Sequence, residues 1–330
     1  MMRMTVLASG SKGNSTVISS SRTRVLVDAG LSCRELLRRM ALAGEDPTTL
    51  DAILITHEHI DHVAGLAVLA RRLRIPVYIT EPTHRAWVRM LTPRTTMTYA
   101  KWLDHVQQEK EARAAAVAQA TSTPATEPGD PRAAFEEVGS PATNPISLEA
   151  ACEPESPTKS NPTQLPAVEY FRPGTSFCIG DLDITPFTIP HDAADPCGFV
   201  FSAEGIRMAL ATDLGYVPPN VKAALKRIDV LLLESNHDLE MLRDGPYPWS
   251  VKQRVLSRVG HLSNDATAEF LSTDYDGGAS YIILGHLSES NNAPELARIA
   301  AEQALASHPT LLGNRVLLAM QSAPLEPITI

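Results

Sequence analysis

Three histidines and one aspartate lie within six residues of the chain, in the segment THEHIDH at residues 56–62. Protonated imidazoles packed this closely would repel one another, whereas neutral imidazoles around a divalent cation bind it through their nitrogen lone pairs. In an extended turn, side chains two residues apart point the same way, so His57 and His59 can share one ion. Asp61 and His62 follow the bend and can reach a second ion. We therefore predict a metal site rather than a solvated polar loop.

The segment resembles the His-x-His-x-Asp-His signature of the metallo-β-lactamase superfamily, and further blocks of that family's pattern follow in order. His191 lies in TIPHDAADPCGF, Asp213 in ALATDLG and His286 in YIILGHLSESNN, each after an apolar run. The resemblance implies seven metal ligands: His57, His59 and His191 on a first ion, Asp61, His62 and His286 on a second, and Asp213 bridging the two. It also implies that Asp28, in LVDAG, orients a ligand histidine and raises its basicity.

Imidazole and carboxylate ligands without thiolate suit Zn²⁺, Mn²⁺ or Fe, and we expect two divalent ions, Zn²⁺ or Mn²⁺, as cofactors. Two ions about 3.5–4 Å apart lower the pKa of a shared water and clamp the reacting group, so that a bridging hydroxide can attack. Asp61 and Asp213 are thus expected to serve catalysis as well as metal binding. Such a centre hydrolyses esters at a phosphorus or a carbonyl, which leaves two classes of hydrolase open.

Blocks that cover most of the chain resemble the YycJ/WalJ-like branch of the superfamily. They include LASGSKGNST at residues 7–16, LLLESNHD at 231–238 and GHLSNDATAEFL at 260–271. This resemblance implies a phosphodiesterase, most specifically a 5′→3′ exonuclease acting on DNA. The alternative is a thioester or lactone hydrolase similar to the glyoxalase II branch, which uses the same metals on a carbonyl carbon.

Four further side chains are candidates for contacts with a phosphodiester. His261 resembles the additional histidine that ribonuclease Z-like phosphodiesterases use at the scissile phosphate, where it could stabilise charge or protonate the leaving oxygen. The alternative is a polar helix cap. Lys12 and Asn14, in the loop SGSKGNS, either bind substrate by cradling a phosphate or belong to a plain hairpin turn. His237 is either a substrate contact or part of a polar loop.

Basic and aromatic residues surround these candidates in the sequence. Charge runs usually form solvated faces, but three bases on a predicted helix could contact phosphates: Lys252, Arg254 and Arg258. Aromatic residues make up only 5% of the chain, so a long base-stacking platform is not evident. Three aromatic side chains near the site are expected to pack in the core or in loops: Tyr216, Tyr247 and Trp249.

Short apolar runs that alternate with amphipathic segments must position these side chains. Residues 4–8, 23–27 and 52–56 are predicted as strands, with SGSKGNS as the turn that joins the first two. Residues 32–43 are predicted as a helix, because Ser32 can cap it and Glu35 follows three residues later. Residues 64–73 are also predicted as a helix. Helices among many strands indicate a layered α/β fold. The resemblance implies the αββα four-layer sandwich of the superfamily, as a single domain over residues 1–330.

An insert at residues 101–168 interrupts this pattern. Residues 101–120 are rich in Ala, Gln, Glu and Lys, which favours an exposed helix. Residues 121–168 hold nine of the 25 prolines and almost no large apolar side chains, so we predict a disordered segment. A tolerated surface insertion is the favoured interpretation. The other is that this acidic insert binds a protein partner or covers the site.

The composition narrows the class of protein. With 38 acidic and 29 basic residues the chain carries a formal charge of −9, which excludes a wholly basic nucleic-acid-coating protein but not a local basic groove. The four cysteines lie far apart, as expected in a reducing compartment. No long apolar segment occurs at the start of the sequence. We therefore expect a cytoplasmic protein with a DNA substrate and no membrane partner.

Overall fold

The computed structural model describes residues 1–92, 107, 161–306 and 313–330. Met1–Leu91 and Asn161–Ile330 form one compact unit. The predicted helix at 101–120 and most of the predicted disordered segment lie outside the described residues, and Val168, the last residue of that segment, begins a strand. Among the described residues, no helix combines the length and the apolar character needed to cross a membrane.

The first sheet of the described unit has seven strands and mixes the two pairing directions. Its N-terminal strands pair antiparallel, and the strands that follow pair in parallel. In spatial order the strands are β14 (Ile328–Thr329), β1 (Arg3–Ala8), β2 (Ser15–Ser19), β3 (Arg24–Val27), β4 (Ala52–Leu54), β5 (Val77–Ile79) and β6 (Val168–Tyr170).

The second sheet, also of seven strands among the described residues, has a similar arrangement. An antiparallel meander leads into four parallel strands, of which the inner three are largely buried and the edge strand is partly exposed. In spatial order the strands are β13 (Arg315–Leu318), β12 (Tyr281–Gly285), β11 (Val230–Glu234), β10 (Ile206–Ala211), β9 (Cys197–Ala203), β8 (Leu182–Thr188) and β7 (Phe177–Ile179).

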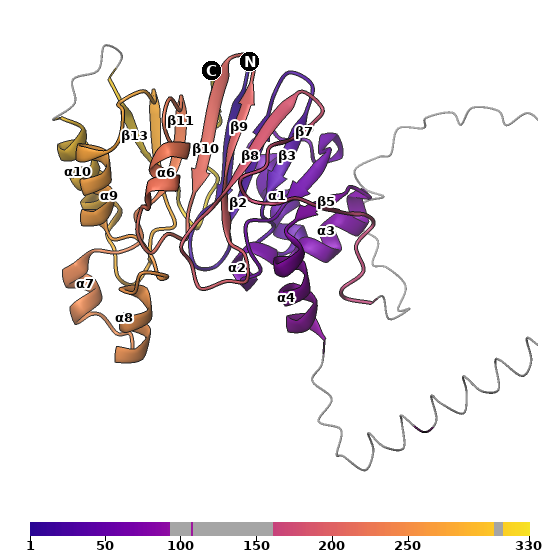
Figure 1. Ribbon diagram of the computed structural model, residues 1–330, viewed down its shortest axis with the longest axis horizontal. Coiled ribbons are helices and arrows are strands. Elements are labelled where there is room, and N and C mark those ends of the chain that lie inside the picture. The colour runs from indigo at the N-terminus through magenta and orange to yellow at the C-terminus, as the bar shows by residue number, and fades with distance from the viewer. Residues whose placement is uncertain (93–106, 108–160, 307–312) are drawn as a thin grey trace, which may run out of the picture. The chain divides into compact units, whose positions relative to one another are not determined.

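Helices cover the outer face of each sheet, so the unit has four layers (Figure 1). The first sheet is covered by α1 (Cys33–Leu42), α3 (Leu66–Leu73) and α4 (Glu81–Leu91), with the short η1 (Pro47–Thr49) and α2 (Ile60–Val63) in its loops. The second is covered by α6 (Pro219–Ala224), α9 (Asn264–Thr273) and α10 (Pro294–Leu305). Two further helices, α7 (Leu239–Asp244) and α8 (Trp249–Val255), lie beyond the end of that sheet (Figure 1).

Three apolar cores fill the spaces between the layers. Side chains such as Val6 and Leu54 meet Phe199 of the opposite sheet in the central core. One outer core lies under α1, α3 and α4, around Trp87. The other lies under α6, α9 and α10, around Phe270. The predicted αββα sandwich is therefore confirmed.

Two local predictions need correction. SGSKGNS does not join the first two predicted strands, because Ser15–Ser19 forms β2 between them and pairs with both β1 and β3. The helix expected at residues 64–73 begins at Leu66 as α3, and the separate short helix α2 precedes it. Gly65, the residue before α3, packs so closely against the carbonyl of Leu31 that a Cβ would collide with it, so glycine is required at this position.

Candidate metal centre

The predicted ligands lie on loops at the ends of parallel strands from both sheets. Asp28 directly follows β3, and His286 directly follows β12. Asp213 comes two residues after β10. These three residues have φ values of 60°, 55° and 62°, in the left-handed region that non-glycine residues rarely adopt. Strained backbone of this kind concentrates at functional sites, where surrounding structure enforces it.

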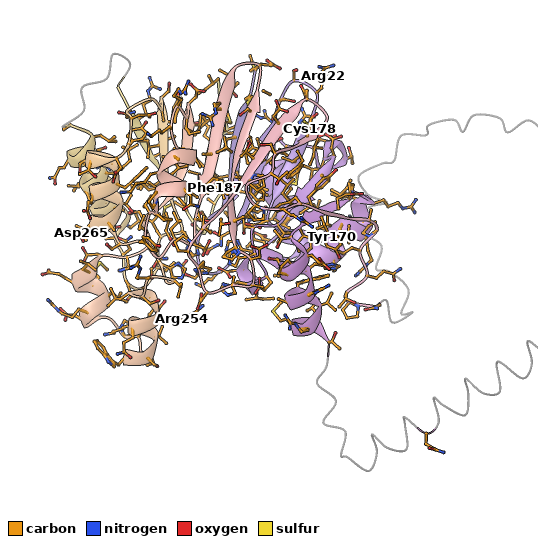
Figure 2. The ribbon with its side chains drawn as sticks, viewed as in Figure 1. Arg22, Tyr170, Cys178, Phe187, Arg254 and Asp265 are labelled. Carbon is orange, nitrogen blue, oxygen red and sulfur yellow. The ribbon has the colours of Figure 1, made fainter. Side chains whose placement is uncertain are left out.

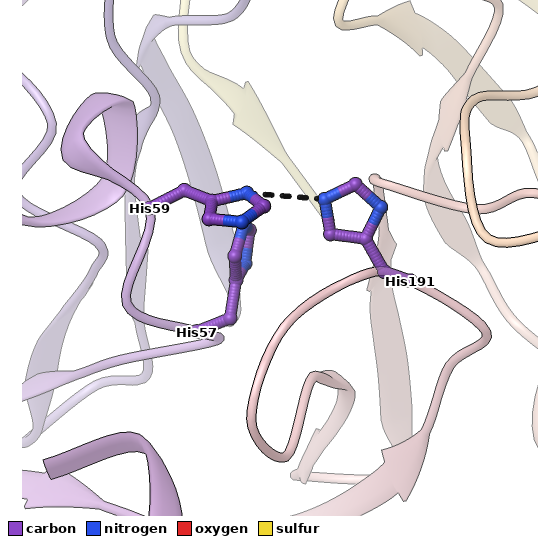
Figure 3. A group of neighbouring side chains, drawn as sticks. All are labelled: His57, His59 and His191. Atoms are coloured by element: carbon purple, nitrogen blue, oxygen red, sulfur yellow. Dashed lines mark hydrogen bonds between the residues drawn. The ribbon is translucent and has the colours of Figure 1, made fainter. Parts of the chain in front are cut away.

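A first cluster consists of three histidines from two distant segments. His57 and His59 come from the turn after β4, and His191 comes from the loop after β8 (Figure 3). One ring nitrogen of each lies within 4.8 Å of the others. The Nδ1 atom of His59 is 3.2 Å from Nε2 of His191, whose Nδ1 lies 3.2 Å from the Gly260 carbonyl oxygen. This carbonyl orients the His191 ring with Nε2 toward the cluster.

A second cluster contains Asp61, His62 and His286, again with ligand atoms within 4.8 Å of one another. The Asp61 Oδ2 atom lies 3.6 Å from Nε2 of His62 and 3.7 Å from Nε2 of His286. Asp213 lies between the two clusters, because one of its oxygens is 3.4 Å from His62 Nε2 and the other is 3.8 Å from His191 Nε2. The structure thus brings all seven predicted ligands together.

The chemistry of the cluster fits divalent metal ions. The Nε2 atoms of His57 and His286 and the Oδ2 atom of Asp213 are buried and have no hydrogen-bond partner among the described residues. Buried polar atoms without partners are costly, and metal coordination would satisfy all three. Burial opposes charge on His62, yet Asp213, Asp28 and Asp61 together raise its pKa to about 9. The carboxylates therefore favour positive charge at this point.

Asp28 lies behind the second cluster. Its Oδ2 accepts a hydrogen bond from His62 at 2.8 Å and another from the Thr56 hydroxyl at 2.9 Å, while Oδ1 accepts from the Thr56 amide at 2.9 Å. With Nδ1 of His62 held in this way, Nε2 faces the cluster. Carboxylates that hold ligand histidines fix the tautomer and raise the basicity of the ring.

A second buried carboxylate, Glu234 at the end of β11, was not among the sequence predictions. Its Oε1 lies 2.8 Å from Nδ1 of both His261 and His286, and its Oε2 accepts backbone hydrogen bonds from Leu214 and Leu262. Burial alone would raise the pKa of Glu234, but the two histidines lower it below its usual range. The sequence carried one weak signal for it, an acidic residue ending a fully apolar strand.

The four predicted substrate contacts occupy different surroundings. His261 is partly exposed beside Asp213 and faces the cluster. Asn14 is buried, and its side-chain Nδ2 lies 3.0 Å from Nε2 of His62. Its backbone amide donates a hydrogen bond to the Asp61 carbonyl. The Lys12 ammonium is exposed and paired with Glu289. The structure does not bring His237 into the cluster.

His237 has only 1% of its surface exposed, and neither ring nitrogen has a hydrogen-bond partner in the described parts of the chain. Its surroundings therefore differ from those expected of a side chain on an open polar loop. A direct role for Lys12, Asn14 or His237 in substrate binding stays a prediction.

Comparisons with known proteins agree with this geometry. Residues 8–251 match the family model described as the metallo-beta-lactamase superfamily. The chain belongs to the metallo-β-lactamase superfamily. It is 32% identical over 304 residues to exodeoxyribonuclease WalJ of Streptococcus pneumoniae, which covers 92% of this chain and 88% of the relative. Exodeoxyribonuclease YycJ of Bacillus anthracis is also 32% identical, over 92% of this chain and 89% of its own. The predicted YycJ/WalJ-like branch is confirmed.

Solved structures show the same fold at much lower identity. The metallo-β-lactamase fold protein YhfI from Bacillus subtilis superposes with a TM-score of 0.57 at 13% identity, over 99% of this chain and 100% of that one. The short form of human tRNase Z superposes with a TM-score of 0.53 at 15% identity, over 98% of both chains. These similarities support the fold alone.

Proposed function

We propose that this protein is a metal-dependent exonuclease that hydrolyses phosphodiester bonds of DNA in the 5′→3′ direction. The observation that carries the proposal is the convergence of the seven predicted metal ligands, with the hydrogen-bonded pair His261 and Glu234 beside them. The relatives named exodeoxyribonuclease match nearly the whole chain rather than a part of it. Both facts favour a phosphodiester over the carbonyl substrate of a thioester or lactone hydrolase.

The chain binds divalent metal through these clusters, and we propose two ions, Zn²⁺ or Mn²⁺. The first would be held by His57, His59 and His191, and the second by Asp61, His62 and His286, with Asp213 between them. Ions at these positions supply an activated water and neutralise charge on the phosphate. The donor set of imidazole and carboxylate suits either metal.

His261 is the residue that we assign to proton transfer. Its Nδ1 is held at 2.8 Å by the Glu234 carboxylate, which leaves Nε2 directed away from Glu234. Because this hydrogen bond fixes the ring, His261 can present Nε2 to the leaving oxygen and donate a proton to it. Glu234 also holds His286, and the proton donor and a metal ligand are therefore fixed by the same carboxylate.

A panel of labelled oligonucleotides tests the proposal directly. With Mn²⁺ or Zn²⁺, we expect a 5′-labelled single strand to release its label as a mononucleotide early, and a 3′-labelled strand to shorten progressively. Phosphorothioate linkages at the 5′ end should block both reactions. Absence of cleavage, together with rapid turnover of S-lactoylglutathione, would establish the thioester hydrolase instead.

Three expectations remain for separate tests. The cytoplasmic location, the single domain over residues 1–330 and a protein partner for the acidic insert all stay predictions. A DNA substrate follows from the proposed function, and the described residues offer one basic rim beside the metal centre that suits it.

A further inference from the structure

A stacked pair, Tyr216 and Arg258, lies at the edge of the metal centre. The guanidinium carbon of Arg258 is 4.4 Å from the centre of the Tyr216 ring. Tyr216 is three residues after Asp213, and Arg258 is three residues before His261. A side chain at Gly215 would collide with the Arg258 carbonyl, so the backbones of the two segments are also in contact. The pair is therefore fixed next to both clusters.

Arg258 has an unneutralised charge at this position. No carboxylate lies within ion-pair distance of its guanidinium in the described ranges. Its neighbour Arg254 differs, because it donates two hydrogen bonds to Asp192, at 2.5 and 3.1 Å (Figure 2 labels Arg254 on α8). With one guanidinium face on the Tyr216 ring, the N–H groups of Arg258 at the edge of the stack stay available to an anion.

Trp249 begins α8 five residues before Arg254, about 8 Å from it along the helix axis. It is 66% exposed on this helix rather than packed in the core or in a loop as expected, whereas Trp87 is buried in the core. Helix α8 is attached to the site through the Arg254–Asp192 pair, and Val259, four residues after the helix ends, accepts a hydrogen bond from the Asp192 amide at 3.1 Å. An exposed indole on a helix anchored to a ligand loop can receive a partner without moving the site.

The charge of the segment around α8 indicates which kind of molecule this surface binds. The segment from residue 239 to 260 has two acidic side chains against four basic ones, Arg243, Lys252, Arg254 and Arg258, in a chain whose net charge is −9. Apolar residues such as Leu256 are also exposed here, as they would be at a protein interface. A protein partner, however, gives no reason for a free guanidinium next to a hydrolytic centre. Cation and aromatic rings together are the combination that binds single-stranded nucleic acid.

We propose that Arg258, stacked on Tyr216, and Trp249 form a binding rim for an unpaired DNA strand. Arg258 holds a backbone phosphate adjacent to the scissile one, and Trp249 stacks on a base farther along the strand. This inference rests on the proposed exonuclease function. It assigns how the strand is held, which neither the ligand set nor His261 determines.

Binding of a fluorescent single-stranded oligonucleotide with phosphorothioate linkages at its 5′ end, measured by anisotropy with the metal-loaded protein, tests the rim without cleavage. Trp249→Ala should raise Kd by about 5- to 100-fold, the range expected for loss of one stacked base, and Trp249→Phe should recover most of the affinity. Arg258→Ala should weaken binding and reduce the slope of log K against log salt by about 0.7, as for one phosphate contact. Ile299→Ala, an exposed apolar position on α10, is the matched control and should bind as wild type.

The outcomes separate this inference from the function on which it rests. If the wild type cleaves no oligonucleotide with either metal, the proposed function fails. If the wild type cleaves DNA while Trp249→Ala and Arg258→Ala both bind it as tightly as the control, only the rim is refuted. A change from dimer to monomer in Trp249→Ala, with unchanged Kd, would assign the surface to a second copy of the chain. Thermal melts of each variant establish that it is folded.

Discussion

Asp28 and Glu234 occupy equivalent positions at the ends of strands in the two sheets. Asp28 holds Nδ1 of His62, and Glu234 holds Nδ1 of both His261 and His286. In each case the other ring nitrogen is left for the centre. A hydrogen bond to Nδ1 of a histidine leaves Nε2 as the nitrogen that can bind a metal or a substrate. These two buried acids therefore orient the histidines of the centre, although neither acid is itself a predicted metal ligand.

Glu234→Gln removes the charge behind His261 but keeps a group of nearly the same shape. We expect kcat for oligonucleotide cleavage to fall by about 10²–10⁴-fold, because the hydrogen bond that orients His261 loses its charged acceptor. Glu269→Gln, on the exposed face of α9, is the control. A kcat equal to that of the wild type would contradict a role for Glu234 behind His261.

His237 makes the stability of the fold depend on pH. Burial lowers its pKa from 6.5 to about 4, so between these values the unfolded chain binds a proton that the folded chain does not. The free energy of unfolding should therefore fall as the pH decreases, by about 2 kcal/mol from pH 7 to pH 5 through this residue. Urea unfolding in chelator, compared between wild type and His237→Leu, measures the contribution. Equal pH dependence in both proteins would contradict it.

At the scale of elements, backbone hydrogen bonds connect the loop after β3 and the loop after β1 with helix α2. The Gly30 amide donates to the Asn14 carbonyl at 3.0 Å, and the Asn14 amide donates to the Asp61 carbonyl at 2.7 Å. The Ala29 amide donates to the His62 carbonyl at 2.8 Å. These bonds fix Asp61 and His62 from behind. They also explain why SGSKGNS, the loop that joins the antiparallel strands β1 and β2, lies beside the centre.

Gly30→Ala should disrupt this junction. A Cβ at Gly30 would collide with the Asp61 carbonyl and with the Asn14 amide, both of which are backbone atoms and cannot move aside. We expect loss of metal from the second cluster and a lower melting temperature. Metal content per chain, measured after gel filtration, checks the first effect. Gly278→Ala is the control, because its nearest neighbour is a side-chain oxygen at 3.3 Å. A fully loaded Gly30→Ala protein would contradict the argument.

How far the sequence predicts these elements depends on how local each signal is. THEHIDH reveals four ligands because they are adjacent in the chain, and the resemblance adds His191, Asp213 and His286 in order. Strand β2 was missed because only two of its five residues, Val17 and Ile18, are apolar, yet all five residues are buried between layers. Glu234 was missed because its partners are 27 and 52 residues away, and only the packing of β11 against β12 brings them together.

At the scale of the whole molecule, the side chains of the candidate metal centre come from both sheets. His57 and His62 follow strands of the first sheet, whereas His191 and His286 follow strands of the second. Without a cation, the imidazoles and carboxylates of the centre must be buried with several unsatisfied atoms. Metal held by these residues would therefore stabilise the contact between the sheets.

Removal of metal should lower the melting temperature. A ligand present at 100 times its Kd stabilises the folded state by about 2.7 kcal/mol, which corresponds to about 5 °C for a folded unit of about 260 residues. Melting curves in EDTA and after addition of Zn²⁺ or Mn²⁺ measure the shift. The His57→Ala/His286→Ala double variant, which lacks a ligand in each cluster, should show little response. A wild-type melting temperature that ignores metal would contradict a centre at this position.

Deletion of residues 93–160, which include most of the insert at 101–168, tests whether this segment is needed for folding, metal binding and catalysis. Every ligand and all three apolar cores come from Met1–Leu91 and Asn161–Ile330. The two ends of the insert are held within that unit, since His84 of α4 hydrogen-bonds to Tyr170 of β6 at 2.8 Å and Arg71 donates to the Gln164 carbonyl at 3.1 Å. A flexible Gly/Ser linker of about 20 residues can therefore replace the insert.

We expect the deleted protein to keep its metal content, its melting temperature within a few degrees, and its kcat on a short oligonucleotide within about twofold, because a surface insertion contributes little to the core. Metal analysis, melting curves and initial rates measure the three properties. If the deletion variant folds and contains metal but cleaves DNA tenfold or more faster or slower than the wild type, the insert covers the site or binds the DNA strand. If it loses metal or does not fold, residues 93–160 are part of the structural unit itself.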